Sequence, residues 1–221
     1  MTLIKNAATI VLIRQEASSH YVLMGQRDSK AAFMPSKFVF PGGSWEDSDK
    51  NIPYARAMDA RQEKLLGLQT NFSNSHKLGI TAIRELWEET GLRLSSKGKF
   101  SAAPISWKSF FLDQQGPNLS SLNFFFRAIT PPGRSHRFDA RFFFCDSLDI
   151  YENLDDFNEA SGELTDLQWV EITKTKNLDL PIITTIVIEH LIGLIRTDLA
   201  YDFVPFFSGG STGLDKKFLR L

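Results

Sequence analysis

Hydrophobic and polar positions along the chain predict a fold of mixed strands and helices. Residues 8–14 and 21–27 are apolar runs rich in strand-forming residues, and the polar stretch between them has the length of a hairpin loop. A third short strand at 37–40 should end at Pro41, because proline cannot donate to a strand ladder, and a tight turn should follow. Further strands are expected at 123–129, 138–145 and 167–172.

Helices are expected where apolar residues recur every three or four positions beside residues that start or stop a helix. Proline in the first turn and glycine just past the last turn are such residues. Helices are expected at 53–66, 79–90 and 181–196, and each has such a proline at its start or such a glycine after its end. Strands mixed with helices, without regular βαβ repetition, predict an α/β or α+β sandwich. The polar stretch 44–77 looks like a helical insertion within a single domain spanning 1–221.

The composition is that of an ordinary folded chain, with 43% hydrophobic and 23% charged residues and a net charge of -1. This balance argues against a nucleic-acid-binding protein, which usually carries a basic excess. The apolar stretch 182–195 is interrupted by polar residues and is shorter than the roughly 20 residues of a membrane span, and no segment resembles a secretory signal. Cys145 is the only cysteine, which fits a reducing compartment, so we expect a cytoplasmic protein without membrane association.

Three glutamates share one face of the expected helix at 79–90. Glu85, Glu88 and Glu89 occupy positions i, i+3 and i+4, opposite an apolar face, so we expect their carboxylates to point outward. Like charges at this spacing repel unless a cation neutralises them, and carboxylate oxygens suit Mg²⁺ or Mn²⁺. Arg84 lies one turn before Glu88 and can orient its carboxylate. A solvated acidic surface is the alternative explanation for three glutamates alone.

A wider motif surrounds these glutamates. The pattern Arg-Glu-hydrophobic-any-Glu-Glu-any-Gly-hydrophobic, at 84–92, resembles the second half of the Nudix box, the signature of the Nudix hydrolases. The sequence Phe-Pro-Gly-Gly at 40–43 resembles the first half. Here positions 43 and 84 are 41 apart, far more than the box allows, so a long insertion separates the halves.

The insertion leaves the intervening glutamate of the box without a clear counterpart. Counting forward from Gly43, its place is taken by Asp49, and counting back from Arg84 it is taken by His76. Glu46 and Asp49 are the candidate substitutes. The family role of this glutamate is mainly supportive, so the metal-binding triad is expected to remain.

The resemblance implies a Nudix-type α/β/α sandwich with a mixed sheet, and hydrolysis of a diphosphate linkage with Mg²⁺ or Mn²⁺. By this resemblance Glu85, Glu88 and Glu89 are metal ligands, and the Gly43 carbonyl is a possible further ligand. The catalytic group would comprise Arg84 together with Glu88 and Glu89. The partner is a small molecule, and a homodimer is a possible assembly.

The insertion and the segments 33–43, 129–132 and 137–143 are similar to the branch of Nudix enzymes that includes coenzyme A diphosphatases. Coenzyme A or an acyl derivative is therefore the leading substrate. Two alternatives stay open. One is another Nudix substrate, such as ADP-ribose or a dinucleotide. The other is a Nudix-fold module that senses a nucleotide without cleaving it.

Charged residues outside the box supply candidates for substrate binding. Arg137 and Arg141 should lie with Asp139 on one face of a strand whose other face is apolar. Two interpretations are equally weighted: a pair of guanidiniums that bind phosphate, or a surface ladder of ion pairs. Arg27, at the end of the second strand, is a weaker phosphate candidate.

An acidic stretch between Arg141 and Lys174 contains nine Asp and Glu residues and no Lys or Arg. Such a stretch is usually a solvated loop. Nudix enzymes often take one further acid from this side of the fold as a base or metal ligand. Glu163, just before the expected strand at 167–172, is our candidate for that acid.

Overall fold

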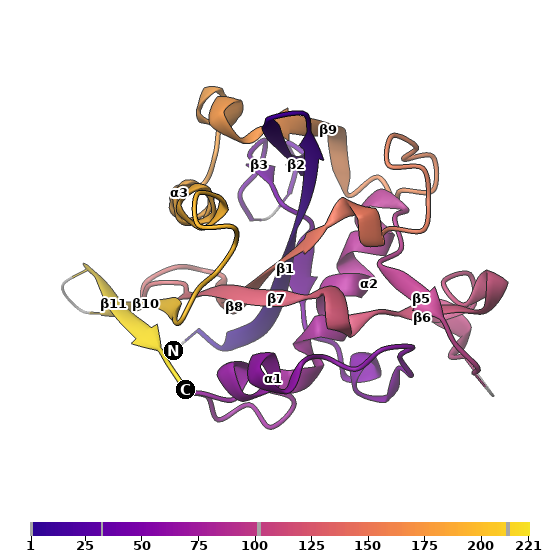
Figure 1. Ribbon diagram of the computed structural model, residues 1–221. Coiled ribbons are helices and arrows are strands. Elements are labelled where there is room, and N and C mark those ends of the chain that lie inside the picture. Colours follow the sequence, from indigo (N-terminus) through magenta and orange to yellow (C-terminus); the bar gives the residue numbers. More distant parts are fainter. Residues whose placement is uncertain (1, 32, 101–102, 211–212) are drawn as a thin grey trace.

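The computed structural model describes residues 2–31, 33–100, 103–210 and 213–221. In this described part, nine strands form one mixed sheet in the order β11-β10-β7-β8-β1-β2-β3, with β4 paired to β1 and β9 paired to β2 (Figure 1). The strands of this sheet are β1 (Ile4–Glu16), β2 (Ser19–Arg27), β3 (Phe38–Val39), β4 (Gly42–Ser44), β7 (Asn123–Ile129), β8 (Arg137–Asp146), β9 (Leu164–Glu171), β10 (Val204–Gly210) and β11 (Gly213–Leu219). A separate pair consists of β5 (Ser95–Lys97) and β6 (Gln115–Pro117).

Strand β1 changes partners along its length, so that β1 and β2 are paired at one end and separated at the other. Its first ten residues pair in parallel with β8 on one side. On the other side, residues 7–9 pair with β4, and residues 13–16 pair with β2. The short strand β4 therefore occupies the space where β2 has diverged from β1, and this is where the two glycines of 40–43 lie.

Helices α2 (Leu78–Thr90) and α3 (Ile182–Ile195) cover opposite faces of the sheet, and α1 (Ala60–Leu66) lies below it in the view of Figure 1. Each face has its own apolar core, one including Leu86 of α2 with Phe143, the other including Val187 of α3 with Phe142. The predicted sandwich of helices on a mixed sheet is thus confirmed. None of the described helices is both long and apolar enough to cross a membrane.

The predicted helix at 53–66 is wrong in its first half. Helix α1 begins only at Ala60, because the Asp59 side chain caps it by accepting from the Arg61 backbone N–H at 2.8 Å. Before it, Ala55 donates its backbone N–H to Pro117 of β6 at 2.8 Å, so a long-range contact holds this segment extended. The turn expected after Pro41 is instead strand β4, and the hairpin of β10 and β11 was not predicted.

The segment 44–77 is only partly helical and is built into the core. Besides α1 it contains short 3-10 turns at Asp47–Asn51 and Ser75–Lys77. Leu65 and Leu66 are almost fully buried, and the Gln62 side-chain oxygen accepts from the Phe124 backbone N–H of β7 at 3.0 Å. These contacts join the insertion to the sheet.

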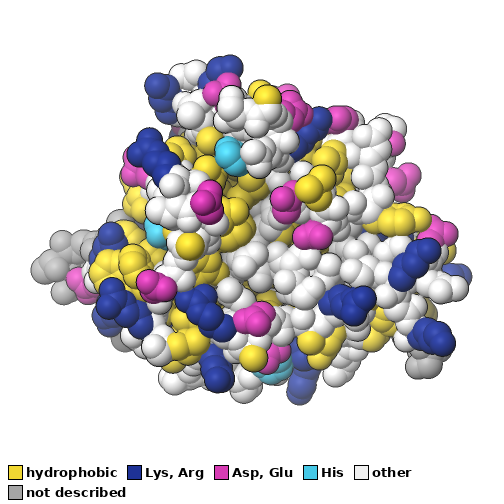
Figure 2. Space-filling view, in the orientation of Figure 1, with side chains coloured by type: hydrophobic (Ala, Val, Ile, Leu, Met, Phe, Trp, Pro, Cys, Tyr) yellow, Lys and Arg dark blue, Asp and Glu magenta, His cyan; other side chains and the backbone are white. Residues whose placement is uncertain are grey.

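Acidic and basic side chains are interspersed on the face shown in Figure 2, in keeping with the balanced net charge.

Candidate active site

Helix α2 carries the three box glutamates and is buried on almost every side. Gly91 ends it in a left-handed conformation with φ of 79°, and its N–H donates to the Trp87 carbonyl at 2.7 Å. Glu85 and Glu89 are only 8% and 2% exposed, whereas Glu88 is exposed. The expectation that all three carboxylates point outward is therefore wrong for two of them, because β1 and β4 pack against this helix.

Two glycines let β4 approach the helix closely enough to contact its carboxylates. The Gly42 backbone N–H donates to Glu89 Oε2 at 2.8 Å. A Cβ atom added at Gly43 would overlap the carboxylate of Glu85, so a larger residue there would displace this carboxylate. The two halves of the motif, far apart in sequence, therefore meet through backbone and carboxylate.

Arg84 lies at the centre of the acidic groups. Its Nε donates to Asp49 Oδ1 at 2.9 Å and its Nη2 to Asp49 Oδ2 at 3.2 Å. Its Nη1 donates to Glu85 Oε1 at 2.9 Å and to Glu88 Oε2 at 3.1 Å. Its Nη2 also donates to the Ser44 carbonyl at 2.9 Å. One guanidinium therefore orients two of the three box glutamates and the end of β4.

Of the two candidate substitutes for the missing glutamate of the box, Asp49 is the one that pairs closely with Arg84. It is completely buried and also accepts from Thr81 Oγ1 at 2.8 Å and from the Glu46 backbone N–H at 3.2 Å. Glu46 itself is exposed and its carboxylate is 4.0 Å from Arg84. His76, the other positional candidate, is exposed in the turn before α2. Counting forward from Gly43 points to Asp49, but the sequence alone left Glu46 beside it as a candidate.

Burial and mutual repulsion raise the pKa values of the box glutamates. Burial, with the charges of Glu88 and Glu163, raises the pKa of Glu85 to about 7 against the attraction of Arg84. Burial and the neighbouring acids raise the pKa of Glu89 to about 8, although the Gly42 N–H opposes this rise. The pKa of Glu88 is also raised, mainly because its side chain, although exposed at the surface, is still partly removed from water.

The donor set fits a hard divalent cation. Carboxylate oxygens and a backbone carbonyl are the ligands that Mg²⁺ and Mn²⁺ prefer, and a cation would relieve the repulsion that raises these pKa values. Among the residues that the structure describes, no three Asp, Glu, His or Cys side chains are already grouped around one metal position. Instead, Glu85 and Glu88 contact Arg84, and Glu89 contacts Gly42.

Arg27 and Glu163 lie beside this group. Arg27 ends β2 and pairs with Leu164 of β9, which directly follows the exposed Glu163. The charge of Glu163 raises the pKa of both Glu85 and Glu89, whereas the charge of Arg27 lowers that of Glu89. The Arg27 Nε is buried and has no hydrogen-bond partner among the described residues. The structure thus brings both predicted residues to the carboxylates of α2.

Arg141 is not at the surface. This contradicts the expectation that it forms surface ion pairs with Asp139 on the outward face of the strand. It is completely buried, and burial lowers its pKa to about 10. Its Nη1 donates to Asn6 Oδ1 at 2.8 Å, and its Nη2 donates to Thr70 Oγ1 at 3.0 Å. Both faces of β8 are covered, one by α3 and the other by the insertion, so Arg141 has no surface on which to bind phosphate. Arg137, at the start of β8, donates its Nε to the Thr130 carbonyl at 3.1 Å.

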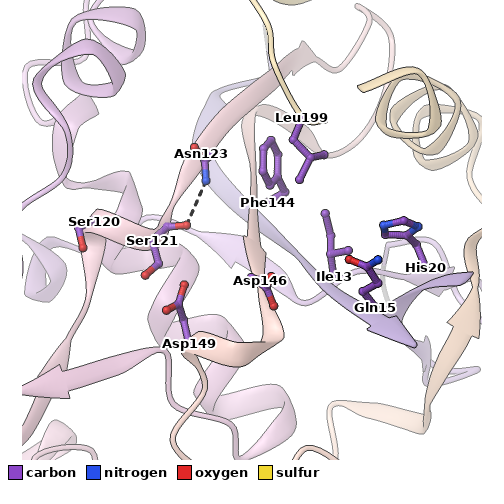
Figure 3. Close-up of a pocket in the computed structure, with 10 residues that line it drawn as sticks. All are labelled: Ile13, Gln15, His20, Ser120, Ser121, Asn123, Phe144, Asp146, Asp149 and Leu199. Atoms are coloured by element: carbon purple, nitrogen blue, oxygen red, sulfur yellow. Dashed lines mark hydrogen bonds between the residues drawn. The ribbon is translucent and has the colours of Figure 1, made fainter. Parts of the chain in front are cut away.

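A cavity of about 320 Å³ lies near the C-terminal ends of β1 and β8 (Figure 3). Apolar side chains and polar side chains share its walls, and none of the α2 glutamates contributes. It is lined by Ile13, Gln15, His20, Ser120, Ser121, Asn123, Phe144, Asp146, Asp149 and Leu199. The cavity is therefore separate from the carboxylate site.

Solved structures share this architecture. A Nudix hydrolase from Alicyclobacillus acidocaldarius superposes with a TM-score of 0.67 at 24% identity, over 87% of this chain and 93% of that one. This chain has the Nudix fold. The Nudix domain of Shewanella oneidensis NrtR, solved with ADP ribose, superposes with a TM-score of 0.51 at 13% identity, over 88% of this chain and 90% of that one. No protein-family model matches the chain.

Sequence similarity leads to the same group of proteins. The acyl-coenzyme A diphosphatase NUDT19 of Xenopus laevis is 30% identical over 128 residues, covering 48% of this chain and 34% of that protein. The match thus spans about a third of the length of that relative. The resemblance to Nudix hydrolases inferred from the box is confirmed by fold and by sequence. In this Nudix fold, β4 and α2 bring the two halves of the box together across the insertion.

Proposed function

We propose that this chain is a Nudix hydrolase that uses Mg²⁺ or Mn²⁺ to cleave a diphosphate linkage in a nucleoside diphosphate derivative. The supporting observation is the surplus of acids around a single guanidinium, with two carboxylates kept buried beside Gly42 and Gly43. Burying uncompensated carboxylates is costly. A cation-binding role explains why the fold tolerates this cost.

The metal would be held by Glu85, Glu88 and Glu89, with the Gly43 carbonyl as a further ligand. A divalent cation there supplies Lewis-acid charge and a water of lowered pKa. Arg84 orients two of these carboxylates through its Nη1.

Two residues at the edge of the site complete the proposal. Glu163 is exposed beside the carboxylates and can accept a proton from the attacking water as general base. Arg27 offers a buried Nε–H that has no partner in the part of the chain that the structure describes, which suits a substrate phosphate oxygen.

Coenzyme A or an acyl derivative is the substrate that we propose. It is supported by the partial similarity to an acyl-coenzyme A diphosphatase. Water attack at the diphosphate would give phosphopantetheine and adenosine bisphosphate. Acyl chains should be tolerated, because the diphosphate lies far from the thiol.

The decisive experiment incubates the protein with coenzyme A, an acyl-coenzyme A, ADP-ribose and a dinucleotide, each with Mg²⁺ or Mn²⁺, and detects products by mass spectrometry. Glu89→Gln is the matched control for contaminating hydrolases. Phosphopantetheine formed by the wild type and not by Glu89→Gln would support the proposal. Turnover of ADP-ribose or a dinucleotide alone would reassign the substrate, and tight binding without any product would favour a nucleotide-sensing module.

A further inference from the structure

Arg141 belongs to a closed ring of contacts that ties the insertion to the sheet. It donates to Asn6 Oδ1 at 2.8 Å and to Thr70 Oγ1 at 3.0 Å. The Asn6 carbonyl accepts from the Trp45 backbone N–H at 2.9 Å, and Thr70 Oγ1 accepts from the Phe72 backbone N–H at 3.1 Å. The Trp45 and Phe72 rings then meet edge to face, with centroids 5.2 Å apart.

This ring holds both ends of the insertion. Trp45 is the first residue after β4, where the chain leaves the sheet, and 70–72 lies on its return toward α2. The nearby Arg127 holds the same return segment, since its Nη1 donates to the carbonyls of Leu68 and Gln69 at 3.0 and 3.1 Å. The insertion is therefore fixed to β7 and β8 by two buried guanidiniums.

Strand β4 is short and is held between β1 and the side chains of α2. It pairs with β1 at three residues only, the central pair being Ala8 with Gly43. Ala8 pairs on its other side with Arg141, so all three residues share one row of the sheet. The position of β4 decides where the Ser44 carbonyl meets Arg84 and where the Gly42 N–H meets Glu89.

We propose that Arg141 is a positioning residue that sets the place of β4, and through it the geometry of the α2 carboxylates. The proposal rests on the proposed function for its effect on metal binding. Arginine is needed because its planar fork contacts Asn6 and Thr70 at once, with Asp139 3.0 Å away, whereas lysine offers one flexible ammonium. A buried residue two strands away from Gly43 would thus control how well the site holds a cation.

The test compares Arg141→Lys and the milder Thr70→Val with Val187→Ala, which removes buried volume from α3 on the other face of the sheet. Three quantities are measured: thermal stability, amide hydrogen exchange at 42–46, and Mn²⁺ affinity by electron paramagnetic resonance. Exchange at 42–46 should be about tenfold faster in Arg141→Lys and about threefold faster in Thr70→Val. Mn²⁺ affinity should fall by similar factors. Val187→Ala should lower thermal stability without changing either readout.

If both ring variants lose thermal stability yet keep wild-type exchange at 42–46 and wild-type Mn²⁺ affinity, Arg141 is only a core residue and the proposal is overturned. The same holds if Val187→Ala changes these readouts as much as the ring variants do. A wild-type protein that binds no Mn²⁺ would contradict the proposed function instead. The exchange measurement would still decide whether Arg141 positions β4, so the two proposals can fail separately. Should Arg141→Lys not fold, Thr70→Val carries the comparison.

Discussion

Two groups of arginine and carboxylate side chains lie on the α2 side of the sheet, and they differ in charge balance. Around Arg84, the acids Asp49, Glu85 and Glu88 outnumber the single guanidinium, and Glu89 adds a fourth carboxylate nearby. In the second group, Arg127 and Arg141 share the one carboxylate of Asp139, at 2.7 and 3.0 Å. The first group has excess negative charge, and the second has excess positive charge.

Most donors of the second group are hydrogen-bonded within the protein. Carbonyls of the insertion, the Asn6 side chain and the Thr70 hydroxyl accept the remaining donors of the two arginines, apart from the Arg141 Nε. The first group lacks such compensation, and two of its carboxylates have strongly raised pKa values. Satisfied buried charge indicates a structural role, whereas uncompensated charge indicates a binding site for an ion of the opposite sign.

The largest effect should follow from removing this excess charge. Glu88→Gln and Glu89→Gln keep shape but lose the charge that holds the metal, so turnover should fall on the order of a hundredfold or more while folding survives. The measurement is kcat on the best substrate at saturating metal. Glu189→Gln, on the exposed side of α3, is the matched control and should stay within about twofold. Wild-type rates in both site variants would remove these glutamates from the metal site.

Breaking the buried pair of Asp49 with Arg84 should give the next largest effect. Asp49→Asn leaves the guanidinium without its buried counter-charge and should lower the free energy of unfolding by roughly 3 kcal/mol. Denaturant titration measures this change. Asp47→Asn, two residues away and exposed, should cost less than about 1 kcal/mol. Equal losses in the two variants would show that Asp49 does not have the supporting role assigned to it.

The pH dependence of stability tests the raised pKa of Glu89. Between the ordinary carboxyl pKa of 4.5 and about 8, the folded state holds a proton that the unfolded state has released, so metal-free stability should fall as pH rises through this range. Glu89→Gln should match the wild type near pH 5 and exceed it in stability by a margin that grows as the pH rises toward 9. Thermal denaturation at several pH values measures the difference. A wild-type advantage at high pH without metal would contradict the prediction.

The smallest effect concerns Arg27. Arg27→Lys keeps the charge but loses the Nε–H proposed to bind phosphate, which no other described residue contacts, so KM should rise about tenfold with kcat nearly unchanged. Arg137→Lys provides the control, because Arg137 contacts the Thr130 carbonyl rather than the carboxylate site, and its KM should not change. Unchanged KM in both variants would leave the site without its proposed phosphate contact.

Much of the framework follows from local sequence patterns. Helices α2 and α3 lie within a residue or two of their predicted ends, because apolar periodicity and flanking proline or glycine act over a few residues. The spacing of Glu85, Glu88 and Glu89 placed them near one another without knowledge of the fold. The start of α1 and the C-terminal hairpin were missed, because Asp59 capping competes with a plausible proline start and the contact of Ala55 with Pro117 is long-range.

What the sequence determined by itself is which side chains share a helix or strand face, because that depends only on backbone geometry. It could not determine burial, since the face of α2 with the glutamates is covered by a strand 41 positions earlier in the chain. Nor could it choose between Glu46 and Asp49, whose contact with Arg84 spans 35 positions. The alternation along β8 placed Arg141 on one face, but only the docked insertion showed that this face is interior. The hydrogen-bond partners and the burial of these side chains depend on contacts between segments that are far apart in the sequence. Only the tertiary structure therefore determines them.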